Sequence, residues 1–386
     1  MKKVLCVILS AVFALTLLTA CGKDSESKSE PKQPINHKLY VRDDSKSKKN
    51  TATFIDTTSD DTTDIEMTLE REEDDCNTFS CTADAAKYNK VSFNYDGLET
   101  MEAAFNEYVS GWFISSSGLL PYTEGVKIEE EIPYATKTFP YRDYEKEVYI
   151  WTPKDYDAKS KDKYSVIYLA DGQKMFDRSG DVMGSWNVAE SVTSMMSLSS
   201  NRAIIVGIAT PESNRAAELT PEIGEVTSND VMYQRLDGKY FADFVCDTLI
   251  PYIEKNYNVY TDAAHNSISG SSLGGLESFY IGMTRPDKIG NVGAMSPTIG
   301  IFSFDTWKEF FKDIKFDENS PFVYFYAGNQ LNDNGLGTEQ MAAYLKANGY
   351  PEDKMFKNIF DKGAHSVPYW RVMFPEFLKY AFRQSK

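Results

Sequence analysis

The amino-acid sequence predicts a doubly wound α/β fold, in which a mostly parallel sheet is flanked by helices on both faces. Short runs of nearly continuous apolar residues predict strands that are buried on both faces, as in parallel sheets. Helix-like segments separate these runs, so strands and helices alternate along the chain. A Gly-Ser-Ser-Leu-Gly-Gly run at residues 270–275 joins one such strand to one such helix. Together these patterns predict a single α/β domain at residues 126–386.

The elements of this domain follow from the apolar pattern in chain order. Strands are expected at residues 166–170, 203–208, 267–269, 292–295 and 322–326. Helices are expected at residues 186–196, 240–255, 276–283, 306–313, 338–347 and 369–382. Ligands bind at the carboxyl ends of the strands in such sheets, so the residues that follow each strand are candidates for a functional site.

The chain begins with a segment that is typical of export. Lys2 and Lys3 precede an apolar stretch at residues 4–18, which is too short to span a bilayer, and we expect residues 1–20 to be a secretory signal peptide. The signal ends in Leu18-Thr19-Ala20-Cys21, which resembles the lipobox of bacterial lipoproteins, where the cysteine is lipidated. This resemblance implies a lipid anchor at Cys21 that tethers the mature chain to a membrane outside the cytoplasm.

Two further segments precede the α/β domain. Residues 21–50 are rich in Lys, Ser, Glu, Asp and Pro, a composition that predicts a disordered tether in which His37 is solvated. Residues 51–125 are expected to form a small, β-rich accessory region, because apolar residues alternate at 65–69 and 91–95 as they do in strands. Residues 98–109 are expected to add a helix to it.

The five cysteines have different expected roles. Cys6 leaves with the signal peptide, and Cys21 is the expected lipidation site. Cys76 and Cys81 lie close in sequence in an exported region and form a candidate disulfide. Cys246 lies on an expected helix and is expected to be buried. No Cys-x-x-Cys pair or histidine-rich cluster in the sequence indicates a metal site.

Ser272 is the central serine of the glycine-rich run. Where a strand turns sharply into a helix, glycines flank the turn and the serine at its apex is exposed as a nucleophile. The Gly-x-Ser-x-Gly pattern is common by chance, but here an apolar strand precedes it and a helix-like segment follows it. The sequence therefore predicts a nucleophile elbow of the kind found in α/β-hydrolases.

A serine nucleophile needs a base, and the chain has three histidines. His265 lies at the far end of the strand that leads to Ser272, about 20 Å away, so it cannot serve that serine. His365 lies on a loop after the partly apolar residues 355–360 and before the last helix. The order of serine, acid and histidine in α/β-hydrolases matches this position, so His365 is the predicted base.

Several motifs resemble those of a known family, the esterases related to enterochelin esterase and to the feruloyl and acetylxylan esterases. In chain order they are an apolar strand followed by Asp171-Gly172-Gln173, Trp186-Asn187, Arg215-x-x-Glu218-x-x-Pro221, residues 249–257 before the elbow, and Gly363-x-His365 with Trp370-Arg371. The resemblance extends from residue 128 to the C-terminus. It implies an α/β-hydrolase fold and a serine esterase that works without a cofactor.

Two loops are expected to supply the oxyanion hole, the pair of amides that bind the negatively charged oxygen of the transition state. One donor is expected to be the amide of Leu273, which follows the nucleophile. The loop after strand 166–170 offers Gly172 or Gln173 as the second donor, and an ordinary turn is the alternative interpretation of that loop.

The acid of the triad is expected after strand 322–326. The family commonly has a carboxylate, often glutamate, two or three residues after a glycine there, and this sequence has none at those positions. Asp333 is the nearest carboxylate and the predicted acid, and an Asx-type turn explains it equally well. Asp361 is an alternative, as is a Ser-His dyad in which Asn329 or a backbone carbonyl orients His365.

Composition limits the partners. The formal net charge of -16 and the pI of about 4.8 argue against nucleic acid. An acidic stretch at residues 56–75 lacks the spacing of a calcium loop and is interpreted as a solvated face.

We therefore expect an extracytoplasmic, lipid-anchored serine esterase without a cofactor. The resemblance implies feruloyl or acetyl esters of polysaccharide as substrates. A siderophore trilactone, acyl transfer to a sugar as in the related mycolyltransferases, and a non-catalytic lipoprotein that binds a ligand on a decayed hydrolase fold are the alternatives. The sequence leaves the oligomeric state open.

Overall fold

The computed structural model describes residues 33–127, 132–176, 184–331, 333 and 335–383. The expected signal peptide, the expected lipidation site Cys21 and the first residues of the expected tether lie outside this part of the chain. Within it, no helix combines the length and the apolar character needed to cross a bilayer.

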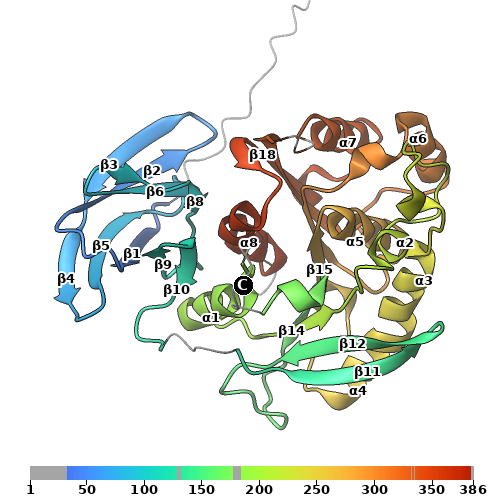
Figure 1. Cartoon of the computed structure of the whole chain (residues 1–386), viewed down its shortest axis with the longest axis horizontal. Helices are drawn as coiled ribbons and strands as arrows, with labels where there is room; N and C mark the ends of the chain where they lie inside the picture. The colour runs from blue at the N-terminus through green and yellow to red at the C-terminus, as the bar shows by residue number, and fades with distance from the viewer. Residues whose placement is uncertain (1–32, 128–131, 177–183, 332, 334, 384–386) are drawn as a thin grey trace, which may run out of the picture. The chain divides into compact units, whose positions relative to one another are not determined.

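The α/β part is built on an eight-stranded sheet with the order β11-β12-β14-β13-β15-β16-β17-β18 (Figure 1). Its strands are β11 (Ala135–Tyr141), β12 (Tyr144–Trp151), β13 (Ser165–Ala170), β14 (Ala203–Ile208), β15 (Asn266–Ser271), β16 (Asn291–Met295), β17 (Phe322–Gln330) and β18 (Met355–Ala364). Six neighbouring strands pair in parallel, in the order β14, β13, β15, β16, β17 and β18. β11 and β12 form an antiparallel edge beside β14. Each of the five expected strands lies in this sheet, so the predicted α/β fold is confirmed.

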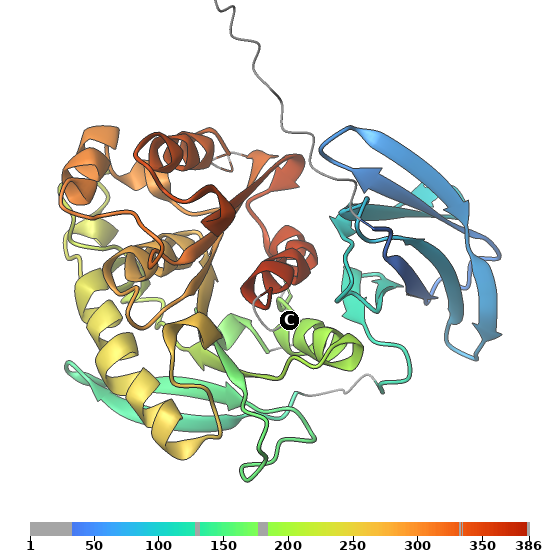
Figure 2. The same cartoon turned by 180° about the vertical axis from the view of Figure 1, so that it is seen from behind.

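Helices cover both faces of the sheet, as Figures 1 and 2 show from opposite sides. Helices α1 (Val188–Leu198) and α8 (Val367–Ala381) share a core with Ile167 and Leu169 of β13. The other face packs against α3 (Gly238–Asp243), the π-helix η3 (Phe244–Leu249), α4 (Ile250–Asn256), α5 (Leu273–Thr284), α6 (Phe304–Phe311) and α7 (Gly335–Ala347). The short helices are η1 (Gly172–Lys174), α2 (Arg215–Glu218), η2 (Val231–Tyr233), η4 (Ala263–His265), η5 (Ile299–Ile301) and η6 (Glu352–Lys354).

The N-terminal region consists of two smaller sheets. One has the order β10-β9-β1-β5-β4, and the other has the order β3-β2-β6-β7, with β8 paired to β6. The strands are β1 (Asn36–Asp43), β2 (Asn50–Asp56), β3 (Asp61–Glu66), β4 (Thr68–Glu72), β5 (Asn77–Asp84), β6 (Lys90–Tyr95), β7 (Leu98–Glu99), β8 (Ala103–Ala104), β9 (Gly111–Ser115) and β10 (Gly118–Tyr122). Buried residues of both sheets, among them Val41 and Phe54, belong to one apolar core.

Two expectations for this region are wrong. The disordered tether was expected to reach residue 50, but β1 begins at Asn36 and is an inner strand of its sheet. Leu39 and Val41 are buried in the core, although the residues around them are polar. His37 was expected to be solvated, but its Nε2 is hydrogen-bonded to the carbonyl of Val109 at 2.7 Å. The helix expected at residues 98–109 is absent from these described residues, which contain the short strands β7 and β8 instead.

The N-terminal region contacts α1 and α8 of the α/β part directly. The side-chain amide of Asn106 donates to the carbonyl of Pro375 in α8 at 3.2 Å. The backbone N–H of Ser110 donates to Ser194 Oγ in α1 at 2.7 Å. The apolar core of the two small sheets continues into the core beneath these two helices, so residues from both parts are buried together.

The candidate disulfide is also wrong. Cys76 and Cys81 are both buried free thiols. Cys76 directly precedes β5 and Cys81 lies within it, so an extended backbone separates their Cα atoms by roughly 16 Å. A disulfide needs Cα atoms within about 7 Å of each other. Burial raises the pKa of Cys81 to about 12, which keeps this thiol protonated and unreactive.

Candidate active site

Ser272 occupies a sharp turn between β15 and α5. Its backbone has φ 59° and ψ -123°, a conformation that non-glycine residues rarely adopt. Two glycines permit this turn: a Cβ atom at Gly270 would lie 2.7 Å from the carbonyl of Gly274, and one at Gly275 would lie 2.7 Å from that of Met295. The residues therefore form the strand–turn–helix geometry of a nucleophile elbow.

The hydroxyl of Ser272 lies next to Thr298. The two side-chain oxygens are 3.3 Å apart, and the backbone N–H of Thr298 donates to the carbonyl of Ser272 at 3.2 Å. Among the described residues, no hydrogen bond joins Ser272 Oγ to His365. Such bonds are often long in a free enzyme and tighten when substrate binds.

His365 and Asp333 meet at the carboxyl ends of β17 and β18, two neighbouring parallel strands. Nδ1 of His365 lies 3.0 Å from Oδ1 of Asp333. The carboxylate side chain is fully buried, whereas 35% of the His365 side chain is exposed. An ionised carboxylate only accepts hydrogen bonds, so it places the proton of a neutral imidazole on Nδ1 and leaves Nε2 free to act as a base.

The buried Asp333 carboxylate has further donors. Ser296 Oγ and the backbone N–H of Gly328 each donate to Oδ2 at 2.7 Å. Burial by itself raises the pKa of this carboxyl, but the hydrogen bonds from His365, Ser296 and Gly328 outweigh burial and lower the pKa overall. Asp333 is therefore held ionised beside the imidazole.

The alternative partners of His365 are engaged elsewhere. Asn329 Nδ2 donates to Asp361 Oδ1 at 2.6 Å, and Gln330 Nε2 donates to the carbonyl of Asp361 at 2.8 Å. These contacts hold the ends of β17 and β18 together. Asp333 is thus the carboxylate that the structure brings to His365, although an Asx turn explained this residue equally well in the sequence.

The expected oxyanion donors lie on either side of the elbow. Leu273 is the first residue of α5, so its N–H has no partner within the helix. Gly172 and Gln173 begin η1, one residue after the end of β13, and Leu169 of β13 pairs with Ser269 of β15. The loop therefore lies at the same edge of the sheet as Ser272.

Side-chain contacts fix the η1 loop. Gln173 exchanges two hydrogen bonds with the backbone of Thr210, one of 3.0 Å and one of 3.1 Å. Nε and Nη2 of Arg215 donate hydrogen bonds to the Asp171 carboxylate, the shortest of which is 2.7 Å. Asp171 itself has φ 55°, and its Oδ2 would lie 3.5 Å from a Cβ atom at Gly274. These contacts thus hold the loop against α5, the helix that begins after Ser272.

Glu218, three residues after Arg215, belongs to a second ion pair, which is fully buried. Lys146 Nζ lies 2.6 Å from Glu218 Oε2, with side-chain exposures of 0% and 1%. Lys146 also donates to the carbonyl of Ala209 at 3.1 Å, and the hydroxyl of Tyr144 donates to Glu218. The Arg-x-x-Glu segment is therefore locked at both of its charged residues.

Two residues that the structure brings to this region, Ser296 and Lys146, were not predicted from the sequence. Ser296 directly follows an expected strand, so its place at the carboxyl edge of the sheet was a usable signal. Lys146 had no such signal, because its partner Glu218 is 72 positions away.

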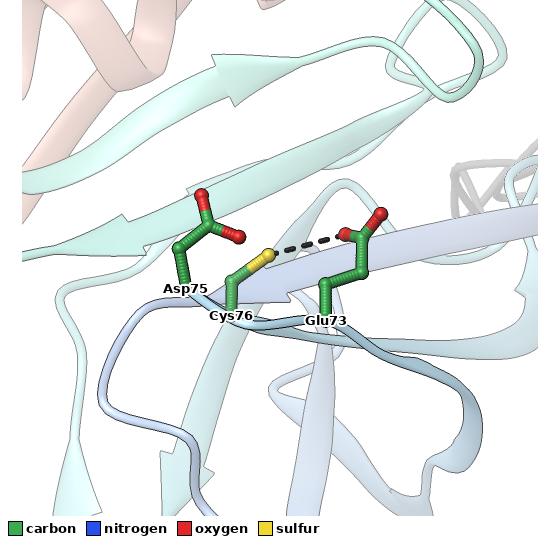
Figure 3. Close-up of side chains that lie close together, drawn as sticks. All are labelled: Glu73, Asp75 and Cys76. Carbon is green, nitrogen blue, oxygen red and sulfur yellow. Dashed lines mark hydrogen bonds between the residues drawn. The ribbon is translucent and has the colours of Figure 1, made fainter.

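Three side chains of the accessory region, Glu73, Asp75 and Cys76, bring atoms that could bind a metal ion close together (Figure 3). The Cys76 thiol donates to Glu73 at 3.3 Å. Arg42 already supplies the positive charge, since its Nε lies 2.7 Å from Cys76 Sγ and its Nη2 lies 3.2 Å from Asp75. We interpret Glu73 and Asp75 as ion-pair partners of Arg42, and Cys76 as an uncharged thiol that is hydrogen-bonded to Arg42 and Glu73.

The fold and the site define an α/β-hydrolase with a serine-hydrolase type of active site. The model of the family described as "Putative esterase" matches residues 142–381, and the chain belongs to this family. It is an esterase, as the sequence predicted.

Two curated relatives differ in length. An uncharacterised protein, YbbA of Bacillus subtilis strain 168, is 22% identical over 245 residues, which cover 61% of this chain and 92% of the relative. The endo-1,4-beta-xylanase/feruloyl esterase of Xylanibacter ruminicola is 26% identical over 148 residues, which cover 37% of this chain and 18% of that protein.

A solved structure resembles the chain over most of its length. The enterobactin esterase of Shigella flexneri, crystallised in the presence of enterobactin, superposes with a TM-score of 0.53 at 16% identity. The match covers 90% of this chain and 93% of the other, so it includes residues of the N-terminal region. At this identity the likeness concerns the fold.

Proposed function

We propose that Ser272 is the nucleophile of a carboxylic-ester hydrolase, that His365 is its base and that Asp333 orients His365. The contact between Asp333 and His365, at the same edge of the sheet as the Ser272 elbow, carries this proposal. His365 Nε2 takes the proton of Ser272 as its oxygen attacks the ester carbonyl, and then returns it to the leaving alcohol. Water cleaves the acyl-enzyme by the same route.

We assign the oxyanion hole to the amide of Leu273 and to that of Gly172 or Gln173. Negative charge develops on the carbonyl oxygen in the transition state, and each well-placed donor contributes about 3 to 4 kcal/mol there. The anchored η1 loop supports this role, because preorganised donors need not move during the reaction. No step requires a cofactor.

The substrate that we propose is an acyl group, feruloyl or acetyl, on a polysaccharide outside the cytoplasm. The relative with feruloyl esterase in its name supports this choice. The signal-like N-terminus and the lipobox-like sequence before Cys21 support export and a lipid anchor.

A siderophore trilactone is the second candidate. The likeness to the enterobactin esterase favours it, because that match extends beyond the α/β part into the N-terminal region. Both candidates are carboxylic esters, so the same catalytic residues would serve either of them.

A substrate panel separates these candidates. The mature chain is assayed with p-nitrophenyl acetate, methyl ferulate, acetylated xylan and enterobactin, beside the variants Ser272→Ala and Ser269→Ala. Ser269 is a buried serine of β15 whose hydroxyl donates to Gly293, so it controls for the loss of a buried hydroxyl. We expect Ser272→Ala to lose at least about a thousandfold in kcat/KM while its thermal midpoint stays close to that of the wild type.

The panel has two opposing outcomes. Hydrolysis that persists in Ser272→Ala would exclude this serine as the nucleophile. A wild-type chain that binds one of these esters without hydrolysing any would favour the non-catalytic alternative.

A further inference from the structure

Ser296 lies at the edge of the sheet between β15, which leads to Ser272, and β17, which leads to Asp333. It is the first residue after β16, which pairs with β15 on one side and with β17 on the other. Its backbone has φ 44°, in the left-handed region that is uncommon for a residue with a side chain. Strained conformations of this kind persist where the surrounding structure holds them, and they are frequent at functional sites.

The Ser296 hydroxyl links Trp370 of α8 to the Asp333 carboxylate. Trp370 Nε1 lies 2.8 Å from Ser296 Oγ, and Ser296 Oγ lies 2.7 Å from Asp333 Oδ2. An indole N–H can only donate, so it occupies a lone pair of the hydroxyl and leaves the hydroxyl proton for the carboxylate. The direction of both hydrogen bonds is therefore determined.

The linked groups are shielded from water. Ser296 is 1% exposed and Trp370 is 7% exposed. A hydrogen bond to a charged group is stronger in such surroundings than in water, and a chain of bonds strengthens its members. Trp370 also contacts His365 directly, edge to face, with ring centroids 5.1 Å apart.

We propose that Ser296 and Trp370 are positioning residues for the hydrolytic reaction, acting together through the Asp333 carboxylate. This inference rests on the proposed roles of Ser272, His365 and Asp333. Trp370 orients the Ser296 hydroxyl, and the hydroxyl holds Oδ2 so that Oδ1 faces Nδ1 of His365. The imidazole then keeps Nε2 turned toward the reacting oxygen.

The test is a double-mutant cycle with Ser296→Ala, Trp370→Phe and the double variant, measured on the most reactive ester of the panel. We expect Ser296→Ala to lose about tenfold in kcat/KM, because a hydrogen bond to a charged group disappears. Trp370→Phe should lose less. The double variant should be no slower than Ser296→Ala, because phenylalanine keeps an aromatic ring beside His365 and removes the indole N–H, which acts through the hydroxyl.

The pH–rate profile gives a readout that a purely structural role would not change. Without the Ser296 proton, the Asp333 carboxylate attracts the proton on the imidazole more strongly. The acidic limb of the kcat/KM profile should therefore move to higher pH in Ser296→Ala and stay in place in the control Ser269→Ala.

Failure of this inference differs from failure of the proposed function. Additive losses in the cycle, or an acidic limb that does not move, would overturn the positioning role even if Ser272→Ala is inactive. Activity that survives Ser272→Ala would overturn the function instead. If Ser296→Ala does not fold, Trp370→Phe alone tests the inference. A rate and a pH–rate profile equal to those of the wild type would then contradict the positioning role of Trp370.

Discussion

Asp333 Oδ1 lies 3.0 Å from His365 Nδ1, although 32 positions separate the two residues in sequence. Asp333 follows β17 and His365 follows β18, and the parallel pairing of these strands brings their carboxyl ends together. A buried carboxylate that also accepts hydrogen bonds from Ser296 and Gly328 thus faces a partly exposed imidazole. This pair is the part of the site that distinguishes Asp333 from the other carboxylates nearby.

Replacement of the acid tests this pair. Asp333→Asn should lower kcat by about a thousandfold or more, because the amide no longer fixes the imidazole tautomer. The control is Asp361→Asn, whose carboxylate is exposed and accepts from Asn329. Steady-state kinetics on one ester suffice, and equal losses in both variants would contradict the assignment of Asp333.

The stability of the protein should also depend on Asp333 in a defined pH range. The pKa of this carboxyl is lowered by folding, so its stabilising effect is complete above the unfolded pKa of about 3.9 and is lost as pH falls through the folded pKa. The difference in unfolding free energy between wild type and Asp333→Asn should be largest near neutral pH and shrink below about pH 4. Urea unfolding at several pH values measures it, and a difference that grows toward low pH would reverse the sign.

The buried ion pair beside the η1 loop should be sensitive to the loss of one partner. Lys146→Met leaves the Glu218 carboxylate buried without its counter-ion, and we expect it to lower the free energy of unfolding by about 3 to 5 kcal/mol. Lys137→Met, at an exposed position of β11, is the control. Chemical denaturation of both variants provides the comparison, and similar small losses would show that the pair contributes little.

The cysteines should all be reduced. A chain that begins after Cys21 retains Cys76, Cys81 and Cys246, which are free thiols. Denatured protein, prepared without reductant, should therefore react with three equivalents of a thiol reagent. Reductant should change neither its mass nor its thermal midpoint. A single reactive thiol and a gain of about 2 Da on reduction would instead show that Cys76 and Cys81 form a disulfide.

The sequence by itself determined the elements whose signal is local. The runs that became β13, β14, β16 and the first part of β17 are largely apolar, because both of their faces are buried. β15 has one apolar side chain, Ile268, and was recognised from its place before the Ser272 turn. The Ser272 turn was visible because only glycine fits the flanking positions. In β1 the local signal was weaker, since only alternate residues face the core and the residues between them are polar.

Tertiary structure alone decided the contacts between distant segments. The choice of Asp333 over Asp361 depends on how β17 ends beside β18, and the link from Trp370 through Ser296 joins residues 74 positions apart. The separation of Cys76 from Cys81 depends on the extended backbone of β5. Residue types and spacing predict which chemistry is available, whereas the pairing and packing of the strands decide which side chains meet, because those contacts form only when the sheet is assembled.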